Sequence, residues 1–300
     1  MRRAAAIISV SRSVAIHLQK RCESPPAAGA DPEAQKEDQK RIIKYYLKWL
    51  NDNPSRGLSA SPADLAAIGD AIYAAARRLN GIGEDVASFL ELWGEPVKER
   101  RAFHDAAFVL SLLAQGKGGQ LKEPDRLKEL GKLARCRGFA AADAQDFQAA
   151  RSAYTQVVET AKVLRGEKLD PLVLKTNPIL LAMYLELGAV HLELGKAGQK
   201  VQFETARNVF GRVLGQTDSK LKEWWIAKYL YLSVYFYRGV GRDVENARTG
   251  LDSLEGTYPG FDGDKFNMKA RFLDLKEKIA RVMGGAAPPG SPGEPARSSQ

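Results

Sequence analysis

The side chains that most often carry catalysis or bind metals are few in this 300-residue chain, and they are scattered. Its three histidines, His17, His104 and His191, fall in three unlike segments. His104 precedes Asp105, but adjacent helical residues point apart and form no dyad. His191 stands on the apolar stripe of a predicted helix, where we expect a packed or hydrogen-bonded ring. The histidines therefore predict neither a metal site nor a catalytic pair.

The two cysteines provide one candidate for a reactive thiol. Cys22 lies in a leader-like segment and Cys136 in a predicted helix. This arrangement fits no metal spacing and no disulfide framework, and it favours a reducing compartment. Arg135 and Arg137 flank Cys136, and nearby positive charge lowers the pKa of a thiol. A nucleophile also needs a general base and an oxyanion site, which the sequence does not indicate. We predict no catalytic, cofactor-binding or metal-ligating residue, and no enzyme.

Aromatic residues are concentrated in one segment of the second half of the chain. Packing between helices accounts for such a density of rings, and a partner-binding surface is the alternative, because aromatic residues are enriched where proteins bind each other. The cluster comprises Trp224, Trp225, Tyr229, Tyr231, Tyr235, Phe236 and Tyr237.

The elements that must position these residues are predicted to be helices. Valine, isoleucine and threonine never alternate with the period of two that a half-buried strand requires, and apolar residues recur with helical spacing. Ser61, Pro62 and Asp64 form a helix start, with a cap, a proline suited to the first turn and an acid near the positive end of the dipole. The predicted helices cover 33–51, 62–79, 84–93, 96–115, 123–142, 144–164, 178–195, 204–213, 219–238, 243–257 and 264–282.

The most telling spacing lies in NARTGLDSLEGTYPG. Ala247, Leu251 and Leu254 share one helix face, and Pro259 stops the helix because it lacks an amide hydrogen. A small residue lets a neighbouring helix approach, while the larger ones fill the space beyond it. The same pattern of one small and two larger residues recurs at Ala150, Tyr154 and Val157, and at Ala206, Phe210 and Val213.

These residues resemble the tetratricopeptide repeat (TPR) family, whose unit is a helix–turn–helix of 34 residues. Leu187, Gly188 and His191 match the first-helix signature, with histidine in place of tyrosine. The resemblance implies an all-α fold: a short right-handed α-solenoid of helix-turn-helix repeats with an additional helical N-terminal region. The small residues lie 56 and 41 positions apart (150 to 206 and 206 to 247), so the loops between them would be insertions. An ordinary α-helical bundle is the competing structure.

The resemblance also implies a ligand groove, because first-helix residues line the concave side of such arrays. A lining that is basic and aromatic would suit an extended acidic peptide. Counting along each first helix also places Leu185 and Ala189 in the groove. The residues expected to bind a partner are Lys132, Arg135, Phe139, Lys228, Tyr231, Tyr235 and Arg238.

Composition suggests four parts along the chain. Residues 1–32 form a leader and linker, and 285–300 form a tail rich in proline, glycine and serine that has too little apolar content to order itself. Between them we expect a helical region at 33–116 and a TPR-like domain at 120–284, which ends in a capping helix. The first 22 residues are rich in arginine and lack acids, as in mitochondrial transit peptides. A poorly structured leader or an overextended gene start, on a cytoplasmic protein, is the simpler expectation.

The net charge of +9 comes from 45 basic and 36 acidic residues. Because the basic residues are interleaved with acids, the charge falls short of a nucleic-acid signature. We therefore expect a scaffold or adaptor that binds a protein or acidic peptide. A nucleic-acid-associated or regulatory factor is the alternative, and an α-helical hydrolase is a third candidate. No window is apolar for long enough to span a membrane.

Overall fold

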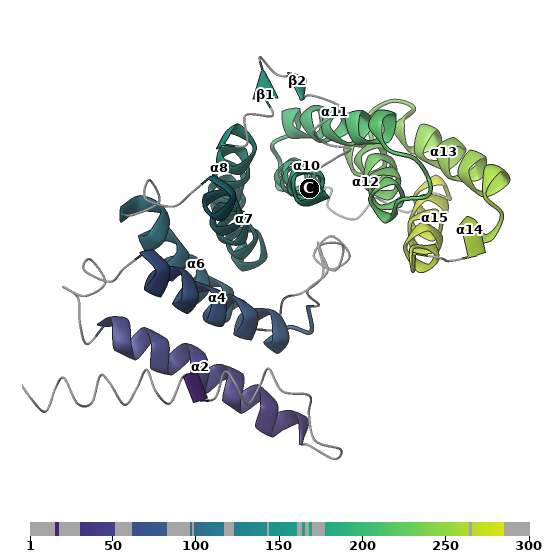
Figure 1. Ribbon diagram of the computed structural model, residues 1–300. Helices are drawn as coiled ribbons and strands as arrows, with labels where there is room; N and C mark the ends of the chain where they lie inside the picture. The colour runs from purple at the N-terminus through teal and green to yellow at the C-terminus, as the bar shows by residue number, and fades with distance from the viewer. Residues whose placement is uncertain are drawn as a thin grey trace, which may run out of the picture. The chain divides into compact units, whose positions relative to one another are not determined.

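The protein is described here by a computed structural model, drawn in Figure 1. The chain divides into two compact units, Met1–Val173 and Leu174–Gln300. The structure describes residues 16–17, 31–51, 62–82, 97, 99–116, 123–142, 144–160, 164–165, 168–169, 178–263 and 266–284.

The first unit begins with two helices whose bounds follow the sequence signals. α2 spans Pro32–Asn51 and α4 spans Pro62–Leu79, with Asp64 in the first turn of α4. α4 ends where Gly81 adopts a positive φ of 68°, which glycine tolerates without strain. The next helix is tied to this turn, because the Glu99 amide donates a hydrogen bond of 2.9 Å to Oδ1 of Asn80.

Three further helices complete the first unit: α6 (Arg100–Gly116), α7 (Glu123–Ala140) and α8 (Ala144–Thr160). Each packs on its predecessor, and α2 also packs on α4. One continuous apolar core joins α2, α4, α6 and α7, and within it the rings of Phe103 and Phe139 stack at 5.3 Å. The unit boundary at 173/174 thus differs from the predicted one at 116–120, because α7 shares its core with α6.

A minimal strand pair interrupts the predicted all-helical pattern. β1 (Leu164–Arg165) pairs antiparallel with β2 (Lys168–Leu169), with Leu164 opposite Leu169. The predicted helix was expected to reach 164, but α8 ends at Thr160. The fold is otherwise all-α in the described residues, as predicted.

The second unit consists of helices that pack in succession: α10 on α11, α11 on α12, α12 on α13, and α13 on α15. In addition, α12 contacts α10 and α15, which are not the helices next to it in the chain. The bounds are Pro178–Lys196 for α10, Val201–Gln216 for α11, Lys222–Arg238 for α12, Asp243–Thr257 for α13, Gly260–Gly263 for α14 and Lys269–Met283 for α15.

The small-large spacing that predicted helix pairing is confirmed as a core pattern. All nine residues of the three matched sets are at most 3% exposed: Ala150, Tyr154, Val157, Ala206, Phe210, Val213, Ala247, Leu251 and Leu254. The backbones of α10 and α11 approach each other closely at Gly188. A Cβ on Gly188 would lie 2.6 Å from the Phe210 ring and 2.7 Å from Val209.

The turn between α12 and α13 is built from glycine and an acid. Gly239 ends α12 in the left-handed conformation with φ of 59°. Asp243, the first residue of α13, accepts a hydrogen bond of 3.1 Å from the Val240 amide. Asp218 and Ser219 stand before α12 as candidate caps in the sequence, but its N-cap position is Leu221, and the Asp218 carboxylate accepts from the Lys220 amide at 2.8 Å.

Several predictions lie outside the described residues: the helix at 84–93, the tail at 285–300 and most of the leader at 1–32. Among the residues that are described, none of the helices is both long and apolar enough to cross a bilayer.

Candidate partner-binding surfaces

Lys132, the first predicted groove residue, lies in an ion-pair network inside the first unit. Its side chain is 12% exposed, and its ammonium group contacts Asp70 of α4 and, at 2.6 Å, Glu129 of α7. Burial raises the pKa of the Glu129 carboxyl, against the opposing effect of Lys132. The lysine therefore links α7 to α4.

The other two predicted residues of this unit are buried. Phe139 is 4% exposed and stacks on Phe103, so its ring belongs to the core. Arg135 is 8% exposed and has interactions within the protein. Leu185 and Ala189 on α10, also expected to line the groove, are both 0% exposed. These four side chains do not form a surface that a partner could reach, and the prediction is corrected for them.

The four predicted residues on α12, Lys228, Tyr231, Tyr235 and Arg238, share one accessible side of that helix, and Trp224 of the aromatic cluster lies on the same side. Trp224, Lys228, Tyr231, Tyr235 and Arg238 recur at intervals of four, three, four and three, and all five are partly exposed. Helical spacing of this kind places side chains in one stripe. We call these five residues the α12 surface.

Two tyrosines form the centre of the α12 surface. The rings of Tyr231 and Tyr235 meet edge to face at 5.3 Å, and their hydroxyl oxygens lie 3.2 Å apart. Burial, followed by the hydrogen bond with Tyr235, raises the pKa of Tyr231 to about 12. The pair presents two rigid rings with a polar edge, a composition common at protein interfaces.

Arg238 is held by carboxylates of the protein itself. Its Nε and Nη2 donate to the two oxygens of Asp243 at 2.7 and 2.8 Å, and its Nη1 donates to Oε2 of Glu204 at 3.1 Å. Its guanidinium also lies 5.5 Å from the centre of the Tyr235 ring. The arginine thus joins α11, α12 and the start of α13, and its charge is already balanced.

Lys228 is the cation of the α12 surface whose charge is not balanced by a carboxylate of the described residues. Within the part of the chain that the structure describes, no ion pair or hydrogen bond involves its ammonium group. Burial lowers the pKa of this lysine. A half-buried cation beside Trp224 and Tyr231 is a favourable position for a carboxylate supplied from outside.

The face of α12 that these residues occupy differs from the predicted one. Tyr231 lies over Gly211 of α11, and Arg238 contacts Glu204 of the same helix. Other α12 rings reach α10 and α15: Tyr237 lies 4.2 Å from the Lys196 ammonium group of α10, and the rings of Tyr229 and Trp225 lie 5.8 and 6.1 Å from the Phe272 ring of α15. The α12 surface therefore borders α11, and the expectation of a lining made of first helices alone is corrected.

Two chemistry-bearing residues of the sequence are packed within the fold. Cys136 is fully buried, and burial raises the pKa of its thiol despite nearby Lys132 and Arg135, so the expected lowering is wrong. His191 is 8% exposed, and its Nδ1 lies 2.7 Å from Oε1 of Gln202, as expected for a packed, hydrogen-bonded ring. Among the described residues, no cluster of three or more His, Cys, Asp or Glu side chains has the arrangement to hold a metal ion.

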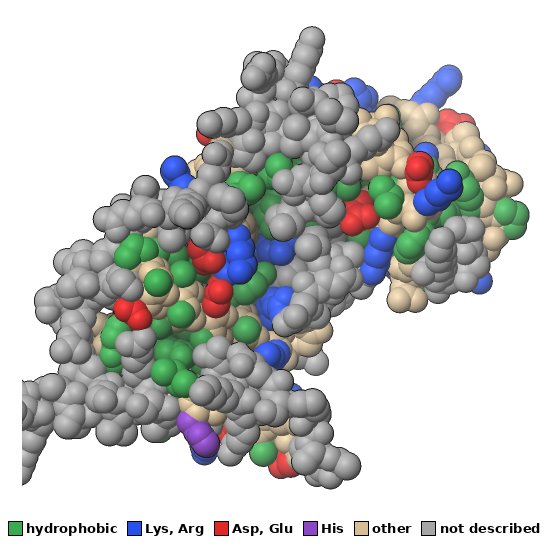
Figure 2. Space-filling model, viewed as in Figure 1, with side chains coloured by type: hydrophobic (Ala, Val, Ile, Leu, Met, Phe, Trp, Pro, Cys, Tyr) green, Lys and Arg blue, Asp and Glu red, His purple; other side chains and the backbone are tan. Residues whose placement is uncertain are grey.

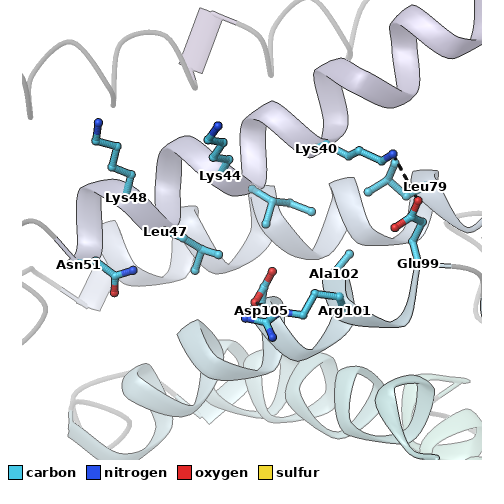
Figure 3. A pocket seen from close by; sticks show the side chains of 11 residues that line it. Lys40, Lys44, Leu47, Lys48, Asn51, Leu79, Glu99, Arg101, Ala102 and Asp105 are labelled. Atoms are coloured by element: carbon cyan, nitrogen blue, oxygen red, sulfur yellow. Dashed lines mark hydrogen bonds and ion pairs between the residues drawn. The ribbon is translucent and has the colours of Figure 1, made fainter.

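A second surface, a cleft between α2 and α6, was not singled out from the sequence. It has a volume of about 510 Å³. Figure 3 shows Leu47 and Ala102 directed between the helices, while the ammonium groups of Lys44 and Lys48 point away from α6. The sequence contains a signal for this cleft. Lysines recur at every fourth position of α2, and Ile43 and Leu47 stand next to two of them. The cleft is lined by Lys40, Ile43, Lys44, Leu47, Lys48, Asn51, Leu79, Glu99, Arg101, Ala102 and Asp105.

Comparison of the chain with models of protein families, with curated proteins and with solved structures finds no match.

Proposed function

We propose that this protein is a non-catalytic scaffold that binds an acidic segment of a partner protein through the α12 surface. In this proposal α10 to α15 form a short right-handed α-solenoid of TPR-like helix pairs, with α15 as its capping helix. The partner's carboxylates would pair with Lys228, and its apolar side chains would lie against Trp224, Tyr231 and Tyr235.

The helix contacts of the second unit support the repeat array. Successive helices pack on each other in chain order, and α12 adjoins both α10 and α15, as stacked helix pairs require. Gly188 and Gly250 stand at the closest contacts: a Cβ on Gly250 would lie 2.5 Å from Leu232 of α12. Small residues at such positions are what an array of tightly stacked helices needs.

Lys228 is the observation that carries the choice of ligand. Of the two cations on the α12 surface, Arg238 is neutralised by Asp243 and Glu204, while Lys228 has no carboxylate among the described residues. Burial disfavours its charged form, and a carboxylate from a partner would favour it again. Charge-assisted hydrogen bonds of this kind are among the stronger polar contacts at interfaces.

A protein partner agrees better with the charge pattern than a nucleic acid does. On the face drawn in Figure 2, described lysines and arginines are interspersed with acidic and hydrophobic side chains. Several cations of the second unit are paired internally, including Lys196 with Glu193, Lys276 with Glu255 and Lys278 with Asp274. Binding to phosphates would instead favour a stripe of unpaired cations.

The test is peptide selection on the full-length chain. Random linear peptides would be displayed and selected for binding, and the affinities of the recovered peptides measured by fluorescence anisotropy. We expect the recovered peptides to be enriched in Asp and Glu next to apolar residues. Lys228→Gln should weaken their binding about tenfold, because a charge-assisted contact is lost.

The matched control is Lys200→Gln, which removes an exposed lysine at the start of α11. This variant should bind the recovered peptides as the wild type does. Recovery of peptides without acidic residues, or equal binding by Lys228→Gln and wild type, would contradict the proposed site. Single-stranded DNA that binds with a steep salt dependence abolished by Lys228→Gln would favour the nucleic-acid alternative.

A further inference from the structure

The cleft between α2 and α6 is separate from the α12 surface, and the residues at its two ends show in which direction the two helices run. Lys40 of α2 lies 3.5 Å from Glu99 at one end, while Leu47 and Asn51 share a second hollow with His104 and Phe108 at the other. The two helices therefore run in the same direction with a groove between them. Lys40 and Asn51 are eleven residues apart, so the groove follows α2 for about 16 Å.

The floor of this groove is apolar and continues beyond the main cleft. Ile43 and Leu47 of α2, Leu79 of α4 and Ala102 of α6 form its floor. The adjoining hollow, of about 440 Å³, shares Leu47, Asn51, Arg101 and Asp105 with the cleft, and adds Phe108, which is 48% exposed. A strip of apolar surface thus runs along the line between the helices.

The charged groups around the groove are not balanced on its two sides. The Lys40 ammonium is paired with Glu37 at 3.3 Å and with Glu99, and Arg101 is paired with Asp105 at 3.1 Å. Lys44 and Lys48, one helical turn apart, are exposed and have no carboxylate partner among the described residues. Both carboxylates of the cleft lining are used internally, which leaves two positive charges along the α2 edge.

From this geometry we propose that the α2/α6 cleft binds an amphipathic helix of a partner protein, about three turns long, with acidic residues along the edge that meets Lys44 and Lys48. Its apolar stripe lies on Ile43, Leu47 and Phe108. A helix fits because parallel helices present ridges and a groove that a third helix can fill. Acids at i and i+4 of that helix match the spacing of the two lysines.

The chain's own ends do not have this chemistry. Its first 22 residues contain no Asp or Glu, so they cannot supply the acidic edge. Residues 285–300 contain a single acid, whereas the acidic edge needs at least two. The proposed ligand is a helix of another protein. This proposal concerns the first unit and does not depend on the α12 surface.

The test is a selection that uses the full-length chain and a displayed library of amphipathic helices, with random residues along both polar edges. We expect the selected helices to have acids on one edge at a spacing of three or four residues. Lys44→Glu/Lys48→Glu should weaken their binding about tenfold, because like charges then face each other. Helices selected anew on this variant should have lysine or arginine at the same positions.

Three further variants distinguish the possible outcomes. Lys200→Glu/Lys220→Glu reverses two exposed lysines of the second unit and should bind the selected helices as the wild type does. Leu47→Asp places a charge on the apolar floor and should abolish binding while circular dichroism shows an unchanged helix content. The selected helices should bind Lys228→Gln normally, which separates this proposal from that for the α12 surface.

Several results would overturn the proposal. One is a selection that yields no helix whose binding depends on Leu47, and another is helices without an acidic edge. Binding of phosphatidylglycerol vesicles that is lost in Lys44→Glu/Lys48→Glu, with no such effect on helices, would assign the cleft to a membrane surface. Self-association that is detected by sedimentation and broken by Leu47→Asp would assign it to a second copy of the chain.

Discussion

The α10–α11 pair and the α2–α6 pair are built from similar helices, yet one contact is closed and the other leaves a cleft. Gly188 has no side chain, so Phe210 and Val209 of α11 occupy the space where its Cβ would stand. Along α2, the side chains that line the cleft toward α6 include Lys40, Lys44 and Lys48. Their charged ends remain in water, and the space between the helices stays accessible.

The two pairs thus differ in the side chains that stand between the helices, a glycine in the closed contact and long lysines along the open one. A small residue lets both helices bury their apolar faces against each other, and no ligand is then needed to cover them. Long cationic side chains keep part of the apolar area uncovered, which stabilises the protein less but leaves a binding surface. The first two predictions that follow test this difference, and the third concerns the α12 surface.

The largest expected effect is on the closed contact. Gly188→Leu should lower the free energy of unfolding by about 3 kcal/mol, because the added side chain would overlap Phe210 and Val209 and force α10 from α11. Urea denaturation followed by circular dichroism measures the change. Gly215→Ala is the matched control, since a Cβ added to Gly215 in α11 would meet no atom within 4 Å. It should stabilise by about 0.5 kcal/mol, and equal effects of the two substitutions would refute the role of close approach.

A smaller effect on stability should distinguish Lys132, which is paired with two carboxylates, from Lys44, which has no carboxylate partner among the described residues. Lys132→Met leaves Glu129, whose side chain is 10% exposed, and Asp70 without their ammonium partner. We expect a loss of about 2 kcal/mol, below the value for a fully buried pair because Asp70 is partly exposed. Lys44→Met, on the edge of the cleft, should change stability by less than about 0.5 kcal/mol. Thermal denaturation of both variants gives the comparison, and a loss at Lys44 as large as at Lys132 would indicate that the cleft edge is structural.

The smallest effect concerns the pH dependence of the α12 surface. Tyr231 has its pKa raised from 10 to about 12, so between these values the unfolded chain releases a proton that the folded protein retains. The stability contributed by neutral Tyr231 is complete below pH 10 and is lost as the pH rises toward about 12. In Tyr231→Phe, the free energy of unfolding should therefore fall less steeply over this window. Tyrosinate absorbance of the folded proteins checks the assignment, and identical titrations of wild type and variant would contradict it.

The sequence was sufficient to predict most helices and the residues that pack them. α13 begins at Asp243 and ends at Thr257, as predicted, because Pro259 stops it and Ala247 and Leu251 mark its buried face. α2 and α4 also lie within one residue of their predicted bounds, since proline and acid mark their starts. Local signals of this kind depend on a few neighbouring residues, and a single sequence contains them.

The surfaces could not be predicted to the same extent, because they depend on which face of a helix meets its neighbours. Tyr229 and Tyr231 differ by two positions, and two positions turn a side chain by about 200° around a helix. One ring therefore contacts α15, and the other contacts α11. Arg238 was expected to be available for a ligand, but Glu204 is 34 residues away in the chain, and no local pattern reveals their contact. The cleft likewise depends on how α6 is placed beside α2.

The buried position of Cys136 gives the first unit an internal sensor. The thiol lies in the core shared by α2, α4, α6 and α7, and it is 0% exposed. A small alkylating reagent can reach this sulfur only after that core separates locally. Its modification rate in the native protein thus reports how often the helices around the cleft come apart, and a ligand that holds α2 against α6 would slow it.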